Sequence, residues 1–139
     1  MKIDFKITTL PQGPESYQLI ANTEGQLIIY DEEKILFSQD GILLVEFARI
    51  LSEWLQNYES NLKKDFFYSS MDFEEEPVLA FYHTSNSNFK IASNLLEVSI
   101  KEEFDEMDLK IAAKNFLKQL YITLIYEGVE VSKFHSFML

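Results

Sequence analysis

The stretch Leu43–Tyr58, LLVEFARILSEWLQNY, is where the spacing of apolar residues changes from that of a strand to that of a helix. Its large apolar side chains recur every three or four residues, at Leu44, Phe47, Leu51, Trp54 and Tyr58. This spacing places them on one face of a helix, and polar residues such as Glu46 and Glu53 fall on the other face. We therefore expect an amphipathic helix over residues 41–59, with Asp40 as its N-cap.

Short strands are expected before this helix. Lys2–Thr9 alternates apolar and polar residues, which is typical of a half-buried strand. The apolar runs Tyr17–Ala21 and Gln26–Tyr30 are joined by a turn that contains Gly25, and this arrangement predicts a β-hairpin. Lys34–Ser38 follows as a fourth strand, so the first part of the chain is expected to form an antiparallel meander.

The second half of the chain is expected to repeat this order of four strands and a helix. Its expected strands are Phe66–Met71, Pro77–Thr84, Asn88–Ser93 and Glu97–Lys101. A second helix is expected to begin near Asp105, where acidic side chains suit the positive end of the helix dipole. Gly128 is expected to end this helix as its C′ residue, because glycine adopts a positive φ at little cost.

These elements predict one α+β domain over residues 1–139. The expected order is four strands, a helix, four strands and a helix, with an antiparallel sheet of short strands and two helices packed on one face. A chain of 139 residues is of the usual size for one domain, and no linker-like composition divides it.

The balance of charge excludes some classes of partner. The chain has 12 basic and 23 acidic residues, a net charge of −11. Binding to nucleic acid depends largely on Lys and Arg contacts with phosphate, so we expect no nucleic-acid partner. An acidic domain suits a basic protein partner, although acidity also serves solubility alone. The sequence shows no signal peptide and no membrane span, which favours a cytoplasmic protein with no membrane contact.

The sequence offers little support for catalysis. Cysteine is absent, which excludes thiolate metal sites and thiol nucleophiles. The histidines, His83 and His135, are far apart in sequence and show no metal-binding spacing. The chain contains no Gly-x-Ser-x-Gly motif, and its four glycines are too isolated to form a phosphate loop. We therefore expect no enzyme activity, no catalytic residue, no cofactor and no metal site.

One segment contains four carboxylates within five residues. Ser70–Pro77 reads SMDFEEEP, and Tyr68 comes just before it. We expect the residues of this segment to bind a partner, because an aromatic anchor beside carboxylates combines apolar contact with orienting charge; they are Tyr68, Asp72, Phe73, Glu74, Glu75 and Glu76. Two alternatives stay open: a solvated loop without a function, and a site for a hard cation such as Mg²⁺ or Ca²⁺.

The same region resembles a known family. The helix segment Glu46–Leu55 is followed by the strand and acidic turn Phe66–Pro77, and this combination is similar to a family of small uncharacterised bacterial proteins. The family pattern is Phe-x-Tyr-x-Ser-Met-Asp-x-Glu-Glu-Pro, and here the acidic run is one residue longer before Pro77. The resemblance covers residues 41–95 and implies no established activity.

A second resemblance concerns size, charge and architecture only. Small acidic α+β proteins of this kind are similar to the immunity proteins of bacterial toxin systems, which implies a partner that is a basic toxin. We therefore expect a non-enzymatic protein-binding module, immunity-like in its use of an acidic surface. The alternatives are a small cation-dependent or ligand-binding protein that uses Asp72–Glu76, and a structural subunit that forms homo-oligomers through Phe134–Leu139.

Overall fold

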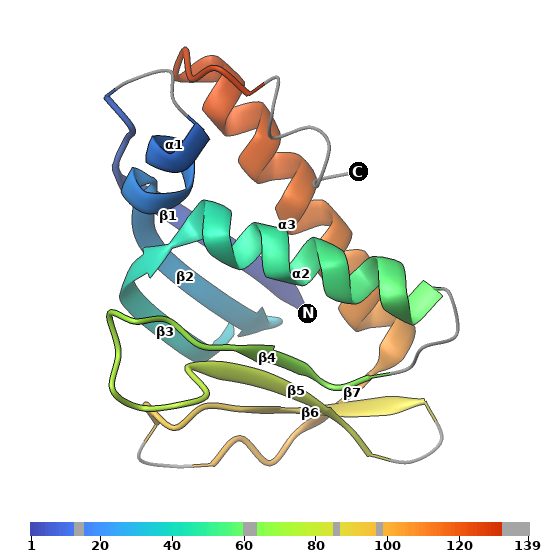
Figure 1. Ribbon diagram of the computed structural model, residues 1–139. Helices are drawn as coiled ribbons and strands as arrows, with labels where there is room; N and C mark the ends of the chain where they lie inside the picture. The colour runs from blue at the N-terminus through green and yellow to red at the C-terminus, as the bar shows by residue number, and fades with distance from the viewer. Residues whose placement is uncertain (13–15, 60–63, 85–86, 97–98, 132–139) are drawn as a thin grey trace.

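The computed structural model describes residues 1–12, 16–59, 64–84, 87–96 and 99–131 (Figure 1). Its elements are, in order, β1 (Lys2–Thr9), α1 (Ser16–Asn22), β2 (Glu24–Asp31), β3 (Lys34–Leu43), α2 (Leu44–Glu59), β4 (Phe66–Tyr68), β5 (Leu79–His83), β6 (Asn88–Ala92), β7 (Glu103–Asp105) and α3 (Glu106–Tyr126). The α+β class that the sequence predicted is confirmed.

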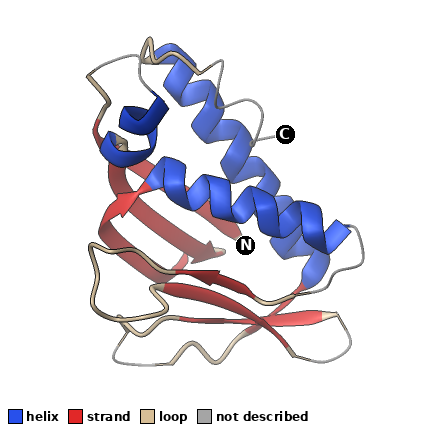
Figure 2. Cartoon of the chain, in the orientation of Figure 1, coloured by secondary structure: helices blue, strands red, loops and turns tan. Residues whose placement is uncertain are grey.

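The strands divide into two antiparallel sheets where the sequence suggested one. The first sheet has the order β1-β2-β3 and the second has the order β4-β5-β6-β7. Every strand pairs with a neighbour along the sequence, so β1 and β3 are the outer strands of the first sheet. Figure 2 shows the two long helices on one side of both sheets.

Three of the predicted elements are wrong. Residues 17–21 lie in α1 and form no hairpin, because β2 begins at Glu24 and pairs with β1. Asp40 is no N-cap, because β3 continues through a bulged region to Leu43 and α2 begins at Leu44. The described residues of the expected strand at 97–101, which are 99–101, are not a strand, and the last strand is β7 instead.

The first sheet depends on a close approach at Gly25. A methyl group on Gly25 would lie 2.1 Å from the carbonyl oxygen of Lys6 on β1 and 2.8 Å from the side chain of Leu44. These distances are far below ordinary van der Waals contact, so only glycine fits between the neighbouring strand and the start of α2.

Helix α2 joins the two sheets through an aromatic core. Phe47 is fully buried, and its ring makes edge contacts with Phe66 and Tyr68 of β4 and with Phe116 of α3. Ring centroids in these pairs are 5.2–5.8 Å apart, within the usual range of aromatic pairs. Phe116 in turn contacts Phe5 of β1 at 5.6 Å, so one core is shared by both sheets and both long helices.

The ends of α3 follow the sequence signals. The Asp105 side chain caps the helix and accepts hydrogen bonds from the backbone N–H groups of Met107 and Asp108. After the helix, Gly128 has a φ of 76° and its N–H donates to the carbonyl of Ile125. Both the N-terminal position and the glycine stop are therefore confirmed.

Candidate functional site

The predicted partner-binding segment lies in the loop between β4 and β5, which we call the acidic loop, residues 69–77. A turn closes within it, because the N–H of Phe73 donates to the carbonyl of Ser70 at 3.1 Å. At its far end the N–H of Asn94 donates to the carbonyl of Pro77 at 3.1 Å, and the Asn94 side-chain amide donates to the carbonyl of Glu76. The loop is thus held at its base and at its turn.

The carboxylates of the acidic loop point to solvent. Asp72, Glu74, Glu75 and Glu76 are all exposed, and Met71 is fully exposed at the turn. The ion pairs among the described residues lie elsewhere, at Lys2–Asp4, Lys34–Glu102 and Lys114–Glu59. Four negative charges within five residues are therefore left without a Lys or Arg partner in the described part of the chain.

Tyr68 has a different place from the one predicted for it. Its side chain is completely buried and its ring packs against Phe47 of α2, so it offers no surface to a partner in this structure. The Glu46 carboxylate and the Ser70 hydroxyl lie close to its hydroxyl, but neither completes a hydrogen bond of ordinary geometry. Burial raises the pKa of the Tyr68 hydroxyl, and the negative charge of Glu46 raises it further.

Phe73 links the acidic loop to the first sheet. Its side chain is half-buried against the core, and a methyl group placed on Gly41 of β3 would lie 3.9 Å from its ring. The same position on Gly41 would be 3.6 Å from a carboxylate oxygen of Glu24. The carboxylate of Glu24 therefore lies near the Phe73 ring and adds a further negative charge beside the loop.

The geometry gives no support to a metal site in the part of the chain described. No three His, Asp or Glu side chains converge there in a way that could hold a metal ion. His83 is exposed and packs its ring edge-on against Phe89, with centroids 5.2 Å apart, while its backbone N–H donates to Asp65. His135 and the segment Phe134–Leu139, proposed above for self-association, lie outside the described residues.

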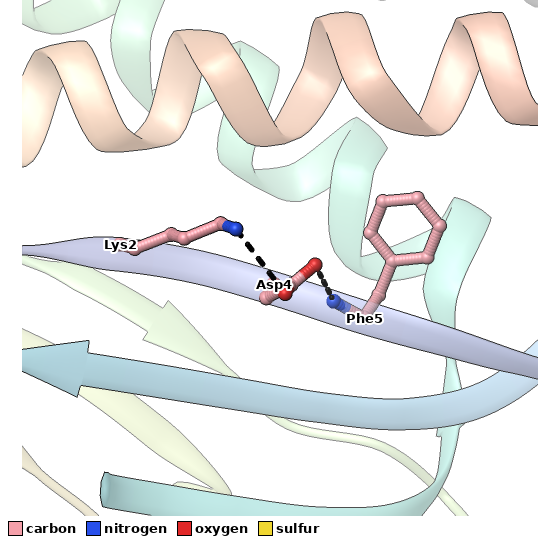
Figure 3. Close-up of polar contacts among 3 residues, drawn as sticks. All are labelled: Lys2, Asp4 and Phe5. Atoms are coloured by element: carbon pink, nitrogen blue, oxygen red, sulfur yellow. Dashed lines mark hydrogen bonds and ion pairs between the residues drawn. The ribbon is translucent and has the colours of Figure 1, made fainter. Parts of the chain in front are cut away.

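A second feature, which the sequence did not reveal, is a groove of about 820 Å³ between β1 and α3. We call it the β1–α3 groove. Residues of β1, together with the flanking Met1 and Leu10, line one wall, and α3 contributes the polar side chains Asn115, Gln119 and Thr123 to the other. In Figure 3, Lys2 and Asp4 lie along β1 below α3, with the Lys2 ammonium 3.5 Å from the Asp4 carboxylate. The available signal was the four-residue spacing of the polar side chains on α3.

Among the described helices, α3 included, no segment is long and apolar enough to cross a membrane.

Comparison with known proteins establishes the family. Residues 3–125 match the family model described as Domain of unknown function (DUF7878), and the chain belongs to this family. A search of curated proteins and of solved structures gives no match. The expectation of an uncharacterised family is thereby confirmed, whereas the match does not bear on the acidic sequence pattern or on the resemblance to immunity proteins.

Proposed function

We propose that this member of the DUF7878 family is a non-enzymatic binding module that holds a basic protein partner on its acidic loop. The observation that supports this function is a hydrogen-bonded loop with four exposed carboxylates that no described cation neutralises. Because hydrogen bonds to Ser70, Glu76 and Pro77 hold the loop backbone, less backbone freedom is lost on binding and more of the attraction of the carboxylates is available for the complex.

The composition of the acidic loop suits recognition of a protein. Met71 is fully exposed beside the carboxylates, and a flexible thioether packs well against varied apolar surfaces. The charges around it favour a basic surface and raise the rate of encounter, since the whole domain carries a net charge of −11. Phe73 supports the acidic loop, because its side chain is half-buried between the loop and β3.

The class of partner follows from the same chemistry. Closely spaced carboxylates resemble the charge pattern of a phosphate chain, so a basic protein that binds nucleic acid is well matched to this loop. Neutralisation of such a partner, as in immunity proteins, is the finer form of the proposal. Its chemical requirement is that the carboxylates occupy the surface on which the partner holds phosphate.

The test is a comparative capture experiment with the purified full chain as bait. Lysate of the source cells is passed over the wild type and over the double variant Glu74→Lys/Glu75→Lys at low salt, and bound protein is eluted with a salt step. The matched control is Glu32→Lys/Glu33→Lys, which changes two exposed residues in the turn between β2 and β3. Each double variant changes the net charge from −11 to −11 + 4 = −7, so the two differ only in where the charges lie.

The expected result is one basic protein that the wild type and the control retain and that the acidic-loop variant does not. Circular dichroism of all three proteins verifies that the fold is intact. Equal loss from both variants would show that net charge alone attracts the partner, and capture by all three would place the binding surface elsewhere. Either result, or an eluate without any stoichiometric protein, contradicts the proposal.

A further inference from the structure

The outer edge of β1 faces the β1–α3 groove with its backbone. The N–H of Phe5 donates to the carboxylate of Asp4 at 2.8 Å (Figure 3), so it points away from β2. The carbonyl of Lys6 lies against Gly25 of β2 and points the other way. Because backbone groups alternate in direction along an antiparallel strand, the N–H and C=O groups of Ile3, Phe5 and Ile7 face the open edge.

The polar side chains on the opposite wall of the groove have nearly the same spacing as alternate residues of a strand. Asn115, Gln119 and Thr123 follow one another every four residues, which is about 6 Å along a helix. Alternate residues of a strand are about 6.6 Å apart. Helix and strand also run alongside each other, because Phe5 contacts Phe116 in the middle of the groove and Leu10 lies with Glu127 at its end.

We propose that the β1–α3 groove binds an extended peptide segment of a partner protein, which adds to β1 as a fourth strand of the first sheet. The occupant is a polypeptide backbone because the edge offers alternating N–H and C=O groups, which another main chain complements. Alternate side chains of this peptide face the amides and hydroxyl of α3, which favours small or polar residues at those positions.

The charged residues of the groove favour particular peptide residues at each of its ends. At one end Lys2 and Asp4 neutralise each other at 3.5 Å. At the other end Glu127 is exposed and forms no ion pair with the described cations. A basic residue of the peptide therefore belongs beside Glu127. Asp4 has a further effect, because its carboxylate occupies the N–H of Phe5 and protects the edge from unselective pairing until a strand displaces it.

The test begins with selection of phage-displayed random octapeptides on the immobilised full chain. Binding of selected peptides is then measured by fluorescence anisotropy, and backbone hydrogen exchange is followed by NMR with and without saturating peptide. In the free protein we expect the amides of Lys2 and Lys6, which face β2, to exchange slowly and those of Ile3 and Ile7 to exchange fast. The proposal predicts that bound peptide slows the exchange of Ile3 and Ile7 at least tenfold.

Variants of α3 make the test specific to the groove. Gln119→Arg places a long side chain in the groove and is expected to weaken peptide binding at least tenfold. Tyr126→Arg is the control, because it adds an arginine to the same helix at a residue that is 87% exposed and does not line the groove. Its affinity for the peptide is expected to stay within twofold of the wild type.

Three outcomes would overturn the proposal. The first is that peptide binding fails the comparison, either because no selected peptide slows the exchange of Ile3 and Ile7 or because the two arginine variants bind peptide equally well. The second is slow exchange of these amides in the free protein at every concentration, which would show that the chain itself covers the edge. The third is slow exchange that appears only as protein concentration rises, which would show that a second copy pairs there.

Discussion

Replacement of Tyr68 by phenylalanine tests whether the buried hydroxyl of Tyr68 lacks a hydrogen-bond partner. The hydroxyl of Tyr68 is fully buried and makes no hydrogen bond of ordinary geometry with the described residues, although the Ser70 hydroxyl and the Glu46 carboxylate lie close to it. A buried polar group without a partner costs about 1–3 kcal/mol, because it gives up its hydrogen bonds to water. Tyr68→Phe keeps the ring and removes only this cost, so we expect the variant to be about 1–3 kcal/mol more stable than the wild type.

The measurement is urea unfolding followed by the fluorescence of Trp54, the one tryptophan of the chain, which is 6% exposed in the folded protein. The urea dependence of the unfolding free energy should be unchanged, because the same surface is exposed on unfolding. A variant that is no more stable than the wild type would refute the reasoning, since it would show that the hydroxyl has a partner of real strength.

The same variant has a pH signature. The unfolded chain releases the Tyr68 proton near the ordinary pKa of 10.0, whereas the folded protein, with its raised pKa, still holds it. The folded state therefore binds more protons above pH 10, and stability falls as pH rises, by about 1.4 kcal/mol per pH unit for each such group. Tyr58, whose pKa is raised by burial and by its hydrogen bond to Glu106, adds a second such contribution. Tyr68→Phe should remove one of the two, and an unchanged alkaline slope would contradict this account.

Two further predictions concern the N-cap of α3 and the packing of β1 against β2. Asp105→Ala removes the N-cap of α3 and should lower the free energy of unfolding in urea by about 0.5–2 kcal/mol. Asp105→Asn should lower it clearly less, because asparagine also caps helices. Equal losses of stability in the two variants would mean that the cap is unimportant. Gly25→Ala places a methyl group 2.1 Å from the carbonyl of Lys6, so the melting temperature should fall by several degrees. The fall should be larger than for Gly128→Ala, where a methyl group meets no described atom within 4 Å and only the positive φ opposes a side chain; the reverse order would contradict the close packing of β1 and β2.

The sequence predicted the long and strongly periodic elements well. Helices α2 and α3 have apolar stripes longer than three turns, and β1 alternates over eight residues, so their type was not in doubt. The short run at residues 17–21 fits one face of a strand as well as one turn of a helix, and only the pairing of β1 with β2 decides between them. The bulge of β3 at Asp40 and Gly41 depends on tertiary contacts in the same way, and so does the division into two sheets.

The candidate site was predictable in part. The concentration of carboxylates at residues 72–76 is visible in the sequence, and the structure places all of these acids at the surface. The burial of Tyr68 was not visible, because the alternation of Phe66 and Tyr68 does not say which face of β4 meets α2. The β1–α3 groove joins segments more than a hundred residues apart in the chain, so the four-residue spacing of polar side chains on α3 could indicate a polar helix face but not that β1 lies opposite it.

The most direct test of the central claim is the affinity of the captured basic protein, measured by titration calorimetry at two salt concentrations. We predict that Glu74→Lys/Glu75→Lys weakens binding more than tenfold, or about 1.4 kcal/mol, and that it reduces the dependence on salt. The control Glu32→Lys/Glu33→Lys, with the same net charge, should stay within threefold of the wild type. Equal affinities of the two double variants would show that the acidic loop is not the binding surface.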